Sequence, residues 1–348
     1  MINFYDLTQQ DLASYLAEKY SYPSYRAKQI FNWVYKKQIT DFEAMTNLPA
    51  LDRASLAGEI FFQQPKVKDL QTSQDGTVKY LFEVVSGPQI ETVLIEQPER
   101  KTLCVSSQYG CGMGCKFCQT GTMGFLANLK AADIVGQVLA VKGKAVRCVD
   151  VFQNLVFMGM GEPLHNYKGV VNALRILCDP DGLAIAPKRI TVSSVGLVSA
   201  IKKFAKEDLG VNLAVSLNAT SDRVREKIMP INKAFYIETL LAALEDFPQS
   251  GRKKITIEYV MLAEVNDRDS DLRRLPKLLK KLNCRINLIP YNANTGLDFK
   301  PPSRDKVYRW QKELSGKGYD TSVRWSKGKD IDAACGQLAT NQKLVNAK

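Results

Sequence analysis

Apolar residues recur every three or four positions through the first part of the chain, as they do along one face of a helix. Thr8 is a favourable N-cap residue, and Leu12, Tyr15 and Leu16 would then share one helical face. Further helical patterns follow before the spacing changes. We therefore expect a small helical domain over residues 1–65.

From Val67 onward the spacing of apolar residues falls to two, which is typical of strands with one buried face. Two such stretches, Thr77–Val84 and Ile90–Ile95, lie close together in the chain. They predict a β-hairpin. We expect this hairpin to form a linker over residues 66–100.

After the hairpin, short apolar runs alternate with helical patterns, which indicates parallel β/α architecture over residues 101–348. Strands are expected near 103–107, 153–158, 189–194, 211–217, 255–261, 285–289 and 320–325, and helices near 131–142, 168–178, 197–206, 235–246, 270–282 and 304–315. Six β/α units are fewer than the eight of a closed barrel. The expected fold class is therefore α/β, a partial (β/α)6 barrel whose open side is wide enough for a macromolecule. Pro276 predicts a kink or a late start in its helix.

Three cysteines stand close together in Cys111-Gly-Met-Gly-Cys115-Lys-Phe-Cys118, directly after the first expected strand. The glycines permit the positive φ values that a tight metal-binding loop needs. A structural zinc site or an electron-transfer cluster takes four protein ligands, yet no fourth cysteine follows within twenty residues and the only histidine is His165. Three thiolates on a [4Fe-4S] cluster would leave one iron free to bind a small molecule. The alternatives are a zinc loop that uses a distant cysteine, or three buried thiols without a metal.

The length and composition of the chain indicate a globular protein. The chain has 348 residues, of which 45% are hydrophobic, and this is enough for one large domain and one smaller one. No apolar run is long enough to span a membrane and the start does not resemble a signal peptide, so we expect a cytoplasmic protein. Eight cysteines in such a protein favour metal or thiol chemistry over disulfides. We expect Cys148, Cys178 and Cys284 to be small buried hydrophobic residues.

The net charge of +12 suggests a polyanionic partner, although excess lysine also serves solubility. Aromatic and basic residues alternate on a helical pattern over Tyr25–Lys37. The expected buried stripe is Ala27, Ile30, Phe31 and Val34, which leaves Arg26, Lys28, Lys36 and Lys37 outside. This helix is a candidate RNA-binding surface, and an ordinary solvated helix is the alternative.

Polar motifs follow several of the expected strands, at the end where parallel β/α barrels carry their active sites. Met158-Gly-Met-Gly-Glu-Pro163 follows the second strand, and its carboxylate is suited to hold an amino group. Taken alone, Gly-Glu-Pro after a strand is more often a plain turn. Ser193-Ser194, Ser216-Leu-Asn218 and Tyr291-Asn292 follow later strands. Because all of these motifs and the cysteine loop fall on one rim, we expect a ligand pocket there.

The cysteine motif, with Phe117 before its last cysteine, resembles that of the radical S-adenosylmethionine (SAM) enzymes. Four further motifs resemble the RlmN/Cfr family of RNA methyltransferases, and the similarity extends from the N-terminal helices almost to the C-terminus. They are Met158–Pro163, Lys254–Leu262, Asn287–Pro290 and Gly328–Leu338.

The resemblance implies a radical SAM barrel with a [4Fe-4S] cluster on Cys111, Cys115 and Cys118. It implies SAM contacts at Gly161, Glu162, Ser193, Ser216, Leu217, Asn218 and Asn292. Most members of the family carry His at the position of Asn218. Asn still offers a donor and an acceptor, so the pocket is expected to survive this departure.

The resemblance also assigns roles to three residues that would otherwise pass as inert packing or as a solvent-facing strand residue. Cys335, in the loop after the last strand, would take a methyl group from a first SAM, and a second SAM would supply the radical that activates this methyl group. Two SAM molecules are thus expected per turnover. Glu91 would accept the proton from the RNA base, and Cys104 would then attack Cys335 and release the product, leaving a disulfide to be reduced.

The expected product is 2-methyladenosine in 23S rRNA near the peptidyl-transferase centre and in tRNA beside the anticodon. An electron donor such as flavodoxin is implied, no membrane partner is expected, and we expect a monomer. One alternative is Cfr-type methylation at C8 of the rRNA adenosine, which Pro163 disfavours because Cfr-like chains tend to carry Ala there. Another is a non-catalytic iron-sulfur protein that binds RNA or senses redox state.

Overall fold

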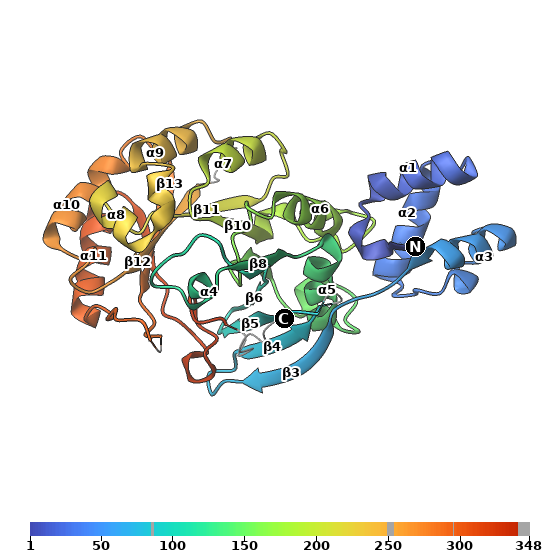
Figure 1. The fold of residues 1–348 in the computed structure, drawn as a ribbon, viewed down its shortest axis with the longest axis horizontal. Helices are drawn as coiled ribbons and strands as arrows, with labels where there is room; N and C mark the ends of the chain where they lie inside the picture. The colour runs from blue at the N-terminus through green and yellow to red at the C-terminus, as the bar shows by residue number, and fades with distance from the viewer. Residues whose placement is uncertain (85–86, 249–253, 295, 340–348) are drawn as a thin grey trace, which may run out of the picture.

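A ten-stranded sheet forms the body of the protein in the computed structural model, which describes residues 1–84, 87–248, 254–294 and 296–339. The strand order is β14-β13-β12-β11-β10-β9-β6-β5-β4-β3 (Figure 1). Strands from β6 to β14 in this order are parallel, and β3 to β6 are antiparallel. Among the described residues no pairing joins β14 to β3, so the barrel is open, as the six β/α units predicted.

The strands lie close to their expected positions. The parallel strands are β6 (Arg100–Cys104), β9 (Asn154–Phe157), β10 (Ile190–Ser194), β11 (Asn212–Ser216), β12 (Ile255–Met261), β13 (Cys284–Pro290) and β14 (Asp320–Val323). Strand β6 ends three residues earlier than expected. The reason is that the amide and carbonyl of Ser106 bond to the side chain of Gln137, at 2.8 and 3.1 Å, instead of continuing the ladder.

The segment predicted as a hairpin linker forms β3 (Lys66–Thr72), β4 (Val78–Glu83) and β5 (Gln89–Gln97). These strands continue the sheet of the barrel through the pairing of β5 with β6. Glu91 and Cys104 thereby stand on neighbouring strands, with Val93 directly opposite Cys104.

Helices cover the outer side of the curved sheet (Figure 1). They are α5 (Ala131–Lys142), α6 (Tyr167–Cys178), α7 (Val198–Ala205), α9 (Ile237–Glu245), α10 (Asp269–Leu278) and α11 (Arg304–Gly316). Pro276 lies inside α10, which begins at Asp269 as predicted, so the expected late start is wrong. The helix ends at Leu278, earlier than expected. The sequence interpretation missed α8 (Asp222–Ile228), the single turn α4 (Gln119–Thr122), and the hairpin of β7 (Gln108–Gly110) and β8 (Phe125–Asn128).

The N-terminal elements gather at one end of the molecule's longest axis (Figure 1). They are β1 (Ile2–Asn3), α1 (Gln9–Tyr20), α2 (Tyr25–Phe31), a π-helical turn (Asn32–Lys36), α3 (Ala50–Glu59) and β2 (Ile60–Phe61). Thr8 caps α1 in a reciprocal capping box with Asp11, as its residue type predicted. Beneath the helices lie Phe4 and Phe31, whose ring centroids are 5.4 Å apart. The predicted stripe on the second helix, from Ala27 to Val34, is buried there.

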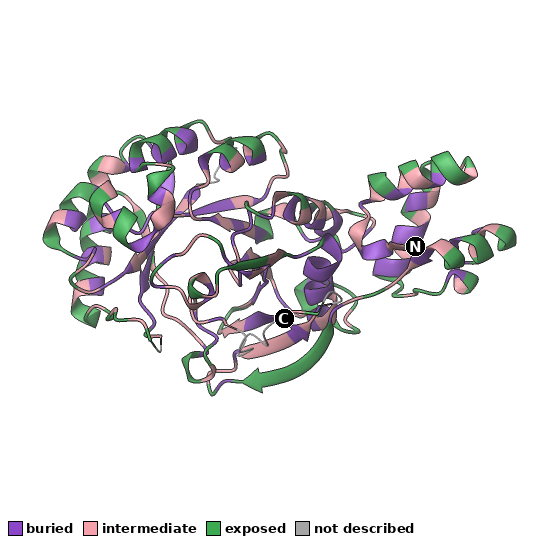
Figure 2. Cartoon of the chain, viewed as in Figure 1, coloured by how far each residue is buried: buried purple, intermediate pink, exposed green. Residues whose placement is uncertain are grey.

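Burial follows the layers: in Figure 2 most of the parallel strands and the inner helix faces are buried, while the outward helix faces and the edge strand β3 are exposed. No described helix is both long enough and apolar enough to cross a membrane.

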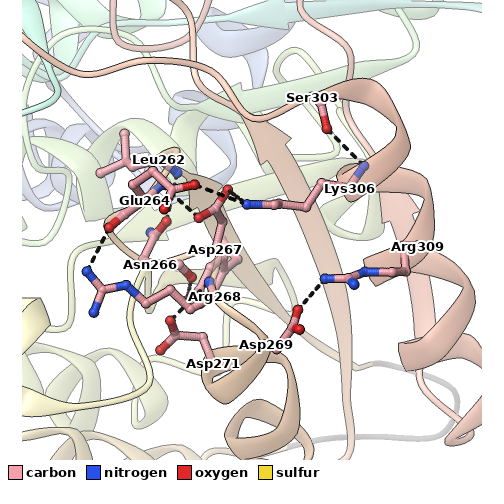
Figure 3. A network of polar contacts seen from close by, with 11 residues as sticks. Leu262, Glu264, Asn266, Asp267, Arg268, Asp269, Asp271, Ser303, Lys306 and Arg309 are labelled. Carbon is pink, nitrogen blue, oxygen red and sulfur yellow. Dashed lines mark hydrogen bonds and ion pairs between the residues drawn. The ribbon is translucent and has the colours of Figure 1, made fainter.

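The loop after β12 is held by a polar network that Figure 3 shows in detail. The fully buried carboxylate of Asp267 pairs with Lys306 of α11 at 2.9 Å. Next to it, Asn266 accepts a hydrogen bond from the Leu262 amide at 2.7 Å and donates one to the carbonyl of Asn218, also at 2.7 Å. This network therefore fixes the backbone of Asn218, one of the expected SAM contacts.

Candidate active site

The cysteine loop is folded by the small β7–β8 hairpin beneath it. Cys111 donates its amide to the carbonyl of Gly124 at 2.7 Å, and Cys118 donates to the carbonyl of Cys115 at 3.2 Å. Gly110 has a φ of +70°, and a Cβ there would lie 2.0 Å from the Gly124 oxygen. A glycine is required at this position because a side chain would separate the two strands.

Cys111, Cys115 and Cys118 all line one cavity at the carboxyl ends of the parallel strands. Among the described residues, no three His, Cys, Asp or Glu side chains converge on a point that a single metal ion would occupy. A four-iron cluster does not require such convergence, because each cysteine binds a different iron. Burial raises the pKa of the Cys111 thiol to about 12, so ligation must displace its proton.

Glu162 is buried in the wall of the same cavity, after β9. Its carboxylate accepts hydrogen bonds from the amides of Val195 at 2.9 Å and Leu164 at 3.1 Å. Burial nevertheless raises its pKa from 4.5 to about 7. Gly161 before it has a φ of +95°, and a Cβ there would lie 2.4 Å from that of Gln108. Only glycine lets the backbone turn so that Glu162 faces the cavity.

Four further residues predicted as SAM contacts line this cavity: Ser193, Ser216, Asn218 and Asn292. The Ser193 hydroxyl donates to the carbonyl of Phe157 at 2.6 Å. Asn218 accepts from the Val260 amide at 2.8 Å and has a φ of +54°. The Oδ1 atom of Asn292 is buried without a hydrogen-bond partner among the described residues, so it is free to bind a donor of a ligand.

Leu217, also predicted as a SAM contact, is different. Its side chain is fully buried in the core, and it is absent from the residues that line the cavity. Its carbonyl accepts a hydrogen bond of 3.0 Å from Arg225, a buried residue of α8 whose Nη2 also bonds the Val195 carbonyl at 2.6 Å. Arg225 thus ties two rim loops together. The sequence interpretation missed it because a lone Arg on a short helix carries no local signal.

Cys335 and Cys104 both lie near the guanidinium of Arg324. Cys335 lines the cavity, and its carbonyl accepts a 3.1 Å hydrogen bond from Asn292. Cys104 is buried on β6. Burial raises the pKa of both thiols, to about 12 for Cys104, while the guanidinium of Arg324 lowers both. Each thiolate would therefore be stabilised by the same cation, Arg324, which the sequence interpretation also missed.

Glu91 is buried on β5 and is not among the residues that line the cysteine cavity. Its Oε1 pairs with Lys79 at 3.2 Å, while its Oε2 is buried without a hydrogen-bond partner in the described part of the chain. Burial raises its pKa, while Lys79 and, to a smaller extent, the backbone of Ala339 lower it. A buried carboxylate with a free oxygen is suited to accept a proton from a ligand.

The residues that line the cavity fit the two groups that the sequence implied, a [4Fe-4S] cluster and SAM. Three thiols suit an iron-sulfur cluster, and the free oxygen of Asn292, the Glu162 carboxylate and the tight turn at Gly161 suit an amino-acid ligand bound beside it.

Two family models match the chain: "Radical SAM superfamily" over residues 105–275 and "Ribosomal RNA large subunit methyltransferase N-terminal domain" over residues 2–61. Among curated relatives, "Dual-specificity RNA methyltransferase RlmN" of Geotalea uraniireducens (strain Rf4) is 44% identical over 337 residues, which are 97% of this chain and 96% of the relative. The protein of the same name from Geobacter sulfurreducens is 46% identical over 338 residues, 97% of this chain and 92% of the relative. The crystal structure of a radical SAM methyltransferase from Sphaerobacter thermophilus matches with a TM-score of 0.87 at 41% identity, covering 97% of this chain and 99% of that one.

Proposed function

Because the chain belongs to the RlmN family, within the radical SAM superfamily, we propose that it methylates C2 of adenosine in 23S rRNA and in tRNA next to the anticodon. The observation that carries the proposal is Cys335, which lines the cavity of the three cysteines and shares the cation Arg324 with a second thiol, Cys104. An iron-sulfur protein that only bound RNA would need neither thiol.

The cluster would be held by Cys111, Cys115 and Cys118, and SAM by Glu162 and Asn292 with the other cavity-lining residues. Bound there, the cluster and SAM supply a carbon-centred radical and a methyl group, with two SAM molecules used per turnover. This chemistry is needed because C2 of adenine is not a nucleophile and does not attack SAM directly. The cluster also requires an electron donor, for which a flavodoxin is suitable.

The protein's own groups would perform the remaining steps. Cys335, as a thiolate stabilised by Arg324, carries the methyl group to the base and binds the base covalently through the methylene carbon. Glu91 removes the C2 proton with its free oxygen. The radical adduct on the base also gives up one electron, which the cluster would accept. Cys104 then attacks the sulfur of Cys335 as a thiolate, which forms the disulfide and breaks the bond between that sulfur and the methylene carbon. This carbon takes up a proton from the solvent and becomes the methyl group of the released base. The resulting Cys104–Cys335 disulfide is reduced to two thiols before the next turnover.

Substrates of this kind imply action in the cytoplasm, and the N-terminal domain over residues 1–65 would contribute to RNA binding. We propose that the protein acts as a monomer. The 66–100 segment and the 101–348 core would then belong to one catalytic body.

Nucleoside mass spectrometry tests the proposed function. Unmodified 23S rRNA and tRNA are incubated with the reconstituted protein, SAM and a reductant, and the digested nucleosides are analysed. We expect 2-methyladenosine. If 8-methyladenosine forms instead, the Cfr-type reaction is correct. If neither nucleoside nor 5′-deoxyadenosine forms, the protein is a non-catalytic iron-sulfur protein.

A further inference from the structure

A second cavity lies at the opposite end of the barrel, where the parallel strands begin. Polar side chains line it from the first halves of the strands: Thr102, Asn154, Thr191, Asn212, Thr256 and Asn287. The interior of a closed β/α barrel is instead filled by branched apolar side chains. The polar lining therefore leaves an open lumen below the SAM end of this barrel.

The entrance to this lumen is basic. Arg100, Lys188, Arg189 and Arg285 line it, and all four are exposed. None of them makes an ion pair with a residue in the described ranges. Among the described lining residues the only acidic one is Glu258, which is buried and also lines the cysteine cavity. The entrance thus presents unneutralised positive charge to the solvent.

The two cavities meet inside the barrel. Met158, Glu258, Arg324 and Cys335 line both of them. The cluster cysteines and Glu162 line only the first cavity, and the four basic residues line only the second. Cys335 is therefore accessible from two opposite directions.

We propose that the substrate RNA binds at the basic entrance and that its unpaired adenosine passes through the lumen to Cys335. This inference rests on the proposed function. The phosphates that flank the adenosine would contact Lys188, Arg189, Arg285 and Arg100, since an RNA backbone is the polyanion that matches this charge. SAM would occupy the other cavity, so the two substrates bind at the same time without competing for one opening.

The lumen also carries groups suited to a base. Trp325 lines it, and its ring is braced by Arg304, with the guanidinium carbon 5.1 Å from the ring centroid, and by Tyr308 at 5.8 Å. Nucleic-acid bases stack readily on such rings. An unpaired adenosine costs the least to extrude from a stack, which favours loop adenosines over paired ones.

Charge reversal at the entrance tests the proposal. The variant Lys188→Glu/Arg189→Glu is compared with Lys280→Glu/Lys281→Glu, a pair of exposed lysines after α10 on the outer layer that changes the net charge equally. The probe is an RNA hairpin with one unpaired adenosine in its loop, and its affinity is measured by fluorescence anisotropy across a salt series. Loss of two phosphate contacts should reduce the slope of log affinity against log salt by about 1.4. The outer-layer variant should keep the slope of the unchanged protein.

Equal losses in both variants, or no loss in either, would overturn the proposal. Arg285→Gln is a milder second variant, which should weaken RNA binding while SAM binding at the other cavity stays the same. The result of this RNA-binding experiment is independent of the result of the nucleoside analysis that tests the proposed function. A protein that binds the hairpin through this entrance but forms no 2-methyladenosine would refute the reaction and leave the RNA site standing.

Discussion

Cys104 is buried and Cys335 is partly buried, and burial alone would make both thiols poor nucleophiles. It raises the pKa of Cys104 to about 12, which leaves little thiolate at neutral pH. Arg324 opposes this shift at both Cys104 and Cys335. Its Nη1 lies 3.3 Å from the sulfur of Met158, and among the described residues it makes no ion pair with a carboxylate. Its charge interacts with the buried carboxyl group of Glu258 as well as with the two thiols.

Cys104→Ala should trap the protein on its RNA, because no thiol remains to release the base from Cys335. We expect a protein–RNA band on a denaturing gel and loss of multiple turnover. Cys284→Ala is the matched control, since this cysteine is also buried but lies at the start of β13. Normal product release by the Cys104 variant would contradict its assigned role.

Glu162 is expected to make the binding of SAM dependent on pH. Burial raises the pKa of its carboxyl group above the usual 4.5, to about 7, so the group is neutral below that pH. The same shift means that Glu162 contributes less to stability as the pH rises from about 4.5 to 7, because the unfolded state ionises first.

If the carboxylate holds the amino group of SAM, affinity should fall below pH 7 by up to about tenfold per pH unit. Calorimetric titration of the cluster-loaded protein between acidic and neutral pH measures this. Glu162→Gln should bind SAM more weakly and without the pH dependence. A wild-type profile that stays flat would exclude this contact.

Asn218, an expected SAM contact, shows how backbone conformation restricts the choice of residue. Its φ of +54° is a left-handed conformation, in which Asn and His are tolerated better than most residues. The family resemblance implied His at this position, and the exchange keeps the backbone while changing the polar group. Its Oδ1 accepts from the Val260 amide, and its Nδ2 donates to the sulfur of Met229 at 3.2 Å, so a contact with SAM would use the second hydrogen of Nδ2.

At the level of elements, regular periodicity was the reliable guide. Strands β9 to β13 and helix α5 lie where alternating and helical patterns predicted them, because buried faces impose those patterns. The β7–β8 hairpin was missed because each strand has only three or four residues. The cysteine spacing predicted three residues that do line one cavity, but Arg225 and Arg324 act through contacts that are distant in sequence and leave no local pattern.

The network after β12 should be important for stability. Lys306→Met would leave the fully buried carboxylate of Asp267 without its cation. Because the Lys306 side chain is 28% exposed, we expect a loss of about 2 kcal/mol, less than for a fully buried pair. Urea unfolding measures it, and Lys312→Met, an exposed neighbour on the same helix, is the control. Equal stability of the two variants would mean that the pair contributes nothing.

For the whole molecule, the basic residues of the N-terminal domain and those of the lumen entrance differ in how far their charge is paired. On the N-terminal domain, Lys28 and Lys36 were expected to face outward, and both are exposed, yet each pairs with Asp181 at 3.4 and 4.0 Å. Part of the positive charge of the N-terminal domain therefore forms ion pairs with the barrel domain. The entrance of the lumen keeps its charge unpaired, so we expect it to dominate the salt dependence of RNA binding.

The open barrel allows the cysteine cavity and the basic lumen to meet in its interior. The cysteine cavity and the basic lumen enter from opposite ends and meet at Cys335. Closure of the sheet with further β/α units would have filled the interior with apolar side chains. The sequence predicted the open barrel from the number of its units, but not the lumen, because its polar residues are single positions on separate strands.

The central claim is that Cys111, Cys115 and Cys118 hold a [4Fe-4S] cluster with one iron open to SAM. Electron paramagnetic resonance of the anaerobically reconstituted and reduced protein, recorded with and without SAM, tests it most directly. The account predicts the signal of a [4Fe-4S] cluster that changes when SAM is added. Bound zinc, or a cluster signal that SAM leaves unaltered, would contradict it.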